Sequence, residues 1–233
     1  MKIIMKMRMS AIRGLALLGV ASMLTNQAGA IIVGGAVTSG VGGFVQLTTP
    51  LGNPFGPANS VGNDTFQNPN LYGFNESQNA VVAAGGLTLN VVPAAAPGGG
   101  IGGGTITAGT IVASHYIFFD PQANTQEGWV QFDSMILGVL TLTDSLAASD
   151  YLANTGVNYL NPDLRGLEAG QDSAWVLTAQ PNRVYVNWSA STPGDYIRVL
   201  TAFSPGAVPD VGSTLLLLGL SLAGLSVARR KLS

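Results

Sequence analysis

His115 is the only histidine of this 233-residue chain, which contains no cysteine. A Ser–His–acid catalytic set needs a serine hydroxyl within hydrogen-bond reach of the imidazole. Ser114 comes directly before His115, but adjacent residues of a strand point to opposite faces, so Ser114 is not its partner in a strand. Because the sequence continues as Tyr-Ile-Phe-Phe, it predicts a packed, structural histidine and no catalytic residue.

Carboxylates are the other side chains that could do chemistry. Two of them could cleave a glycosidic bond, and several in loops could bind calcium, which prefers oxygen ligands. Most stand beside turn residues, where aspartate bonds to the backbone. We therefore predict no metal site and no cofactor, and keep Asn161, Asp163 and Asp172 as candidate ligands should calcium bind. The carboxylates considered for a glycosidase pair are Asp120, Glu127, Asp133, Asp150, Asp163, Glu168 and Asp172.

Aromatic side chains would form a platform for sugars if they were exposed. Trp188 lies on the same strand face as Val184, which predicts a core position, whereas Tyr185 points to the opposite face. The pattern leaves the positions of Trp129 and Trp175 open. A carbohydrate- or calcium-binding module and a secreted glycan hydrolase therefore stay as alternative functions.

Charge is scarce and unevenly distributed. Charged residues make up 9% of the chain, and the body between the two ends carries three cations against eleven carboxylates. Such a surface repels phosphate backbones, so nucleic acid is not an expected partner. The three cations are Arg165, Arg183 and Arg198, and we expect Arg165 to pair with Glu168 and Arg198 with Asp195.

The first thirty residues have the three parts of a secretory signal. A basic stretch precedes an apolar run over residues 14–24, and a short polar part ends in Ala28-Gly29-Ala30, a small-x-small cleavage site. The apolar run is too short for a permanent membrane helix. We predict a signal helix in residues 1–30, read by the secretion machinery and removed by signal peptidase after Ala30.

The C-terminal end also has three parts. The motif in residues 208–214 begins Val-Pro-Asp-Val-Gly, residues 213–228 carry no charge, and Arg229, Arg230 and Lys231 follow at once. As a helix the uncharged segment would be about 24 Å long. Basic residues stay on the cytoplasmic side. The pattern therefore predicts a transmembrane helix with the body of the protein outside.

This arrangement resembles the PEP-CTERM class of sorting tails in its Val-Pro-Asp-x-Gly variant, through Val208, Pro209, Asp210 and Gly212 together with the apolar segment and the basic end. Val211 stands where that class has Ser or Thr. The resemblance implies recognition by exosortase, a membrane-embedded cysteine transpeptidase. It further implies transient anchoring, cleavage of the tail, and delivery to the cell surface or extracellular matrix, with extracellular polysaccharide as a candidate partner.

The many short strands of the body predict an all-β fold, an antiparallel, jelly-roll-like β-sandwich, with a barrel as the alternative. Residues 144–160 predict one or two short helices capped by Asp144 and Asp150, and the glycine-rich residues 97–104 predict a linker or a long hairpin loop. We divide the chain into a signal peptide (1–30), a Gly/Asn/Pro-rich part (31–104), a main sandwich region (105–205) and the tail (206–233). Strands are predicted over residues 44–48, 80–84, 87–92, 105–119, 128–132, 135–142, 174–178, 183–188 and 195–201, with a turn at 180–182.

Residues 105–203 also resemble a body found repeatedly in exported PEP-CTERM proteins. Ser114-His-Tyr116, Phe132-Asp-Ser134 and Asp195-Tyr-Ile-Arg-Val199 are among the residues that carry this resemblance. It implies no chemistry. The sequence as a whole therefore predicts a non-catalytic, exported surface or matrix protein that exosortase sorts, and not an enzyme.

Overall fold

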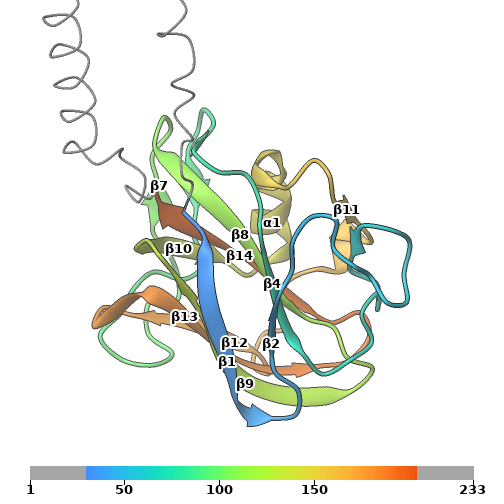
Figure 1. Ribbon diagram of the computed structural model, residues 1–233. Coiled ribbons are helices and arrows are strands. Elements are labelled where there is room, and N and C mark those ends of the chain that lie inside the picture. The colour runs from blue at the N-terminus through green and yellow to red at the C-terminus, as the bar shows by residue number, and fades with distance from the viewer. Residues whose placement is uncertain (1–29, 204–233) are drawn as a thin grey trace, which may run out of the picture. The chain divides into compact units, whose positions relative to one another are not determined.

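A computed structural model describes residues 30–203, in which two main β-sheets pack face to face (Figure 1). Sheet A has the strand order β1-β9-β13-β12, and sheet B has the order β10-β14-β8-β4-β2 with β5 also paired to β8. Sheet A consists of β1 (Ile32–Gly40), β9 (Asn124–Phe132), β12 (Ser173–Leu177) and β13 (Gln180–Ala190). Sheet B consists of β2 (Phe44–Gln46), β4 (Leu71–Asn75), β5 (Ala80–Val81), β8 (Ile111–Phe119), β10 (Ile136–Leu140) and β14 (Asp195–Ala202).

Smaller elements complete the described part of the chain. A parallel pair joins β3 (Ser60–Val61) to β11 (Asn158–Tyr159), and an antiparallel pair joins β6 (Leu87–Thr88) to β7 (Thr105–Ile106). The helical elements are α1 (Thr143–Ala148) and two 3₁₀ turns, η1 (Asp150–Leu152) and η2 (Pro162–Leu164). The predicted all-β sandwich with short helices agrees with this architecture, and its jelly-roll-like order stays a prediction.

Alternating side chains of both sheets form the core between them. In β13 the side chains of Val184, Val186 and Trp188 are buried, whereas Tyr185 between them is only partly covered. From sheet B, Ile117 and its neighbours on the same face pack against them. The period of two in β13 thus places Trp188 in the core.

The opposite face of sheet B is buried as well. Every residue of β8 after Ile111 is buried, and Tyr116 and Phe118 belong to a second apolar cluster with Leu146 of α1 and Leu152 of η1. Figure 1 shows α1 and the β3–β11 region on the side of sheet B away from sheet A. Because β8 is covered on both faces, it has a nearly continuous apolar sequence instead of strict alternation.

One strand prediction and one turn prediction were wrong. The strand expected over residues 105–119 is interrupted at residues 107–110, where Gly109 has a φ of +83°, so β7 pairs with β6 and β8 enters sheet B. The turn expected at residues 180–182 lies inside β13, which begins at Gln180. Strand β1 was missed, because Gly34 and Gly35 dilute its apolar alternation.

The helix caps were also placed wrongly. The residue before α1 is Leu142 and the residue before η1 is Ser149, and neither makes a side-chain capping bond. Asp144 instead lies in the first turn of α1. The carboxylate of Asp150 bonds to the guanidinium of Arg165, a charged donor, instead of to the first N–H groups of its turn.

Strands from both halves of the body share both sheets. Strand β1 lies beside β9 in sheet A, and β4 lies beside β8 in sheet B. The glycine-rich residues 97–104 close the hairpin that joins β6 to β7, as the loop alternative predicted. The sandwich therefore includes residues on both sides of the boundary drawn at residue 104.

Candidate functional site

His115 lies in β8 and is fully buried. Its Nδ1 is 2.8 Å from Asn75 Oδ1 and its Nε2 is 3.1 Å from Thr201 Oγ1. Burial lowers the pKa of the imidazole to about 3, so the ring is neutral at physiological pH. The Ser114 hydroxyl donates to Glu76 on the other face of the sheet. His115 and Ser114 therefore do not form a nucleophile–base pair.

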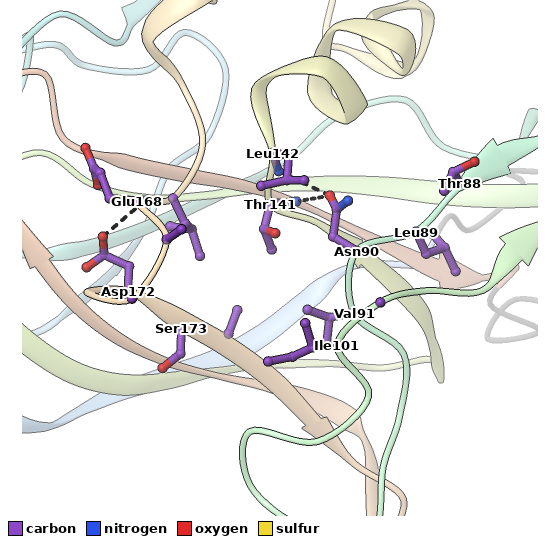
Figure 2. A pocket seen from close by; sticks show the side chains of 15 residues that line it. Thr88, Leu89, Asn90, Val91, Ile101, Thr141, Leu142, Glu168, Asp172 and Ser173 are labelled. Atoms are coloured by element: carbon purple, nitrogen blue, oxygen red, sulfur yellow. Dashed lines mark hydrogen bonds between the residues drawn. The ribbon is translucent and has the colours of Figure 1, made fainter.

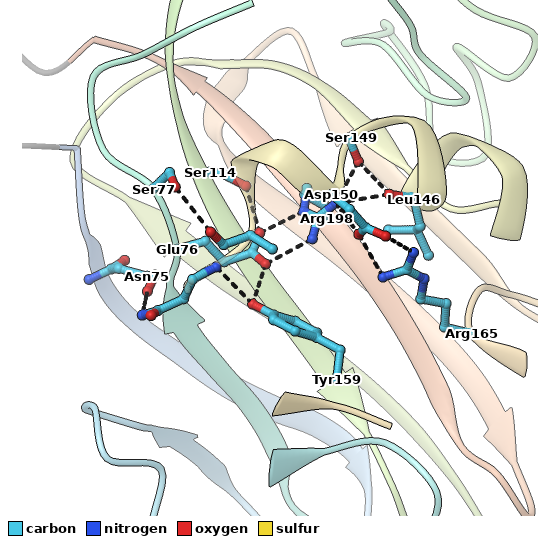
Figure 3. A network of polar contacts seen from close by, with 12 residues as sticks. Asn75, Glu76, Ser77, Ser114, Leu146, Ser149, Asp150, Tyr159, Arg165 and Arg198 are labelled. Carbon is cyan, nitrogen blue, oxygen red and sulfur yellow. Dashed lines mark hydrogen bonds and ion pairs between the residues drawn. The ribbon is translucent and has the colours of Figure 1, made fainter. Parts of the chain in front are cut away.

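A buried ionic network lies on the α1 side of sheet B, where Figure 3 shows Glu76 and Arg198 facing each other. Arg198 Nε is 2.6 Å from Glu76 Oε2, Nη2 is 2.9 Å from Oε1, and both side chains are fully buried. Ser114 and Tyr159 each donate a 2.6 Å hydrogen bond to the same carboxylate. Every oxygen of Glu76 is thus engaged in holding the fold.

The same network overturns both expected ion pairs. Arg198 Nη1 bonds to the Leu146 carbonyl oxygen and lies 3.4 Å from Asp150 Oδ1, and Arg165 Nη1 donates to Asp150 at 2.8 Å. Asp195 and Arg198 are three residues apart in β14, so their side chains leave opposite faces of the strand. Glu168 lies instead with other carboxylates.

The carboxylates proposed for a glycosidase pair are mostly scattered through the described residues. Asp120 is buried and accepts hydrogen bonds from the Tyr196 hydroxyl at 2.7 Å and the Phe66 amide at 3.2 Å. Glu127 accepts a 3.2 Å bond from Asn187. Asp133 and Asp150 have partners elsewhere, in the Ile31 amide and in Arg165.

One group of three carboxylates does form in the described part of the chain, from Glu168, Asp172 and Asp195. One carboxylate oxygen from each lies within 4.8 Å of those of the other two. Asp172 is oriented by two backbone donors, Ser189 N–H at 2.7 Å and Glu168 N–H at 3.3 Å. We call these three residues the acidic cluster.

Asp195 is the unusual member of the acidic cluster. It is fully buried, and neither of its oxygens has a hydrogen-bond partner. Burial, and then the charges of Asp172 and Glu168, raise its pKa to about 9. Gly194, with a φ of +92°, makes the turn that starts β14 at Asp195.

Of the three residues predicted as candidate calcium ligands, only one belongs to the acidic cluster. Asp172 lies in the acidic cluster, whereas Asp163 does not, and Asn161 donates a 2.6 Å hydrogen bond to Asn63. A signal for Asp195 exists in the strand pattern. It shares a face of β14 with Ile197 and Val199, which is an unusual place for a carboxylate without a function.

A pocket of about 470 Å³ adjoins the acidic cluster (Figure 2). Leu89, Val91 and Ile101 line it with apolar surface. Figure 2 shows two members of the acidic cluster, Glu168 and Asp172, at one end of the pocket.

An aromatic row crosses the outer face of sheet A. Trp129, Tyr185 and Trp175 are register partners on β9, β13 and β12, and all three are partly exposed. Trp175 and Tyr185 stack with ring centroids 5.6 Å apart, and the Arg183 guanidinium lies 3.9 Å from the centroid of Trp129.

The predicted sorting and export residues fall mostly outside the described range. Ala28, the motif residues Val208, Pro209, Asp210 and Gly212, and the basic residues Arg229, Arg230 and Lys231 all lie there. Ala30 is described and buried. Within residues 30–203, no helix has the length and apolar character needed to cross a membrane.

Comparison with known protein families matches residues 207–232 to the VPDSG-CTERM motif. No curated protein and no solved structure matches the chain. The family match covers the residues that carry the predicted resemblance and confirms its variant. The chain therefore carries a PEP-CTERM-like C-terminal sorting signal, which implies export and a surface or extracellular location.

Proposed function

We propose that the protein is a non-catalytic component of the cell surface or extracellular matrix, which an exosortase-type transpeptidase sorts and cleaves at its C-terminal tail. The observation that carries this proposal is the sorting signal at residues 207–232. The uncharged segment 213–228 would hold the chain in the membrane while Arg229, Arg230 and Lys231 stay inside. Pro209 would disfavour helix and favour an extended backbone at Val208, the form that a processing enzyme can bind.

The environment of the body's titratable residues supports a structural role. His115 has both ring nitrogens bonded and its pKa lowered to about 3. The carboxylate oxygens of Glu76 and Asp120 accept hydrogen bonds from partners within the fold. These groups, which could act as acids or bases if exposed, instead stabilise sheet B.

The predicted signal cleavage has a structural consequence. The backbone nitrogen of Ile31, the first residue after Ala30, lies 2.9 Å from Asp133 Oδ1, and the Asp133 amide bonds back to the Ile31 carbonyl. Cleavage after Ala30 would convert that nitrogen to an ammonium group beside a carboxylate. The mature N-terminus would then be held by a charge-assisted bond to Asp133, in the turn between β9 and β10.

Deletion of residues 208–233 tests the proposal. We expect the full-length chain to reach the cell surface or medium in processed form, and the deletion variant to lose surface retention and tail processing. Asp210→Ala should leave an unprocessed, membrane-bound chain. Val211→Ser, which restores the residue of the family motif, is the matched control and should be processed normally. If deletion left location and size unchanged, the sorting proposal would fail.

Glycan binding is a second candidate function, favoured by the aromatic row Trp129–Tyr185–Trp175. Aromatic rings with polar neighbours at a partly exposed face can stack on sugars, and Trp175 lies on the edge strand β12, where a chain of sugars has access. We expect Trp175→Ala to weaken retention of the full chain on polysaccharide from the producing cells by about tenfold. Leu177→Ala, on the same strand face, is the control. Equal retention of the two variants would contradict a role for the row.

A further inference from the structure

We propose that Glu168, Asp172 and Asp195 bind a calcium ion at the end of the sandwich where the loop before β12 meets the start of β14. The proposal does not depend on the sorting function. It concerns a site in the folded body and holds wherever the chain is delivered.

The spacing of the carboxylates fits one ion. Their oxygens lie within 4.8 Å of one another. Calcium binds oxygen at about 2.3–2.6 Å, so two ligands on opposite sides of it are roughly 5 Å apart. A single calcium ion can therefore contact all three side chains without a change of the backbone.

A second observation points into the same space. Asp195 is fully buried, and neither Oδ1 nor Oδ2 has a hydrogen-bond partner. Buried carboxylates are ordinarily hydrogen-bonded, paired or metal-bound, because the loss of hydration is otherwise uncompensated. Burial and the two carboxylates that face it, Asp172 and Glu168, all oppose ionisation of Asp195. A divalent cation would compensate all three at once.

The surroundings favour a site with shared protein and water ligands. The two backbone N–H groups on Asp172 fix its carboxylate, as donors around metal sites commonly do. Glu168 is exposed and borders the pocket, so water can complete the six to eight oxygens that calcium takes. The cluster offers neither imidazole nor thiolate, which are the ligands that transition metals prefer.

Calcium titration of the purified full chain, stripped with chelator, tests the proposal by calorimetry and thermal unfolding. We expect saturable binding and a rise of the unfolding midpoint with calcium, and a smaller rise with magnesium at equal ionic strength, because magnesium demands stricter geometry. Asp195→Asn should lower calcium affinity by more than about tenfold, since loss even of groups around a metal site costs that much.

Two further variants keep the result decisive. Glu168→Gln changes an exposed side chain, so it should fold normally and also weaken calcium binding. Asp163→Asn, an exposed carboxylate outside the acidic cluster, should bind calcium like the wild type. Absence of a calcium response in the wild type would overturn the proposal. So would undiminished affinity in Glu168→Gln and Asp195→Asn, or an equal loss in Asp163→Asn.

Discussion

Arg198→Met is expected to lower the free energy of unfolding by about 3–5 kcal/mol, the typical cost of removing one partner of a buried ion pair. The guanidinium bonds bidentately to Glu76, and both side chains are fully buried. Without it, the Glu76 carboxylate stays buried with the Ser114 and Tyr159 hydroxyls as its remaining donors. Urea unfolding followed by tryptophan fluorescence measures the loss.

A double variant separates the cost of an orphaned charge from the cost of lost packing. Glu76→Leu combined with Arg198→Met removes both charges, and we expect it to recover most of the lost stability. Arg183→Met is the matched control, because Arg183 lies on partly exposed Trp129 and should contribute only about 0.5–1 kcal/mol. A double variant as unstable as Arg198→Met would contradict this account of the network.

Phe118→Ala is expected to cost about 3–5 kcal/mol, as large-to-small changes in a packed core do. Phe118 lies in β8 on the face of sheet B that points away from sheet A, and it is fully buried. Its ring contacts five others at centroid distances of 5.0–6.5 Å, those of Phe66, Tyr72, Phe74, Tyr116 and Tyr196. Thermal or urea unfolding of the purified variant measures the change.

The control for this prediction is Phe55→Ala, because Phe55 is 65% exposed. We expect that variant to unfold within about 0.5 kcal/mol of the wild type. If Phe118→Ala were equally mild, the outer face of sheet B would be a solvent-facing surface. The third layer, formed by α1, η1 and the β3–β11 region, would then not exist as described.

Local periodicity correctly predicted which side chains of a strand face the core. The alternation of Val184, Tyr185 and Trp188 placed each on the correct side of β13. Strand β1 was missed because glycines occupy positions where alternation would be visible. The interruption of residues 105–119 falls at a turn in which Gly109 has a positive φ, and a single glycine does not stand out in a strand pattern.

Contacts between distant residues could not be read from the sequence. Glu76 and Arg198 are separated by 122 positions, and nothing near either residue indicates the other. Sequence proximity suggested that Arg198 pairs with Asp195, yet strand geometry sends these side chains to opposite faces. The acidic cluster is also a contact between distant residues. Asp195 reaches Glu168 and Asp172 only because β14 packs beside the loop before β12.

The sorting tail could be predicted because it is a local pattern. Its motif, uncharged segment and basic end are contiguous, and the family match at residues 207–232 covers them. The chemistry of the body, by contrast, depends on which side chains the fold brings together.

Intact-mass spectrometry of the mature protein, recovered from the cell surface or medium, tests the central claim most directly. We predict a chain that begins at Ile31 and ends between Val208 and Asp210, with or without the mass of an attached group at its new C-terminus. A mature mass that still includes residues 213–233 would contradict processing by an exosortase-type enzyme.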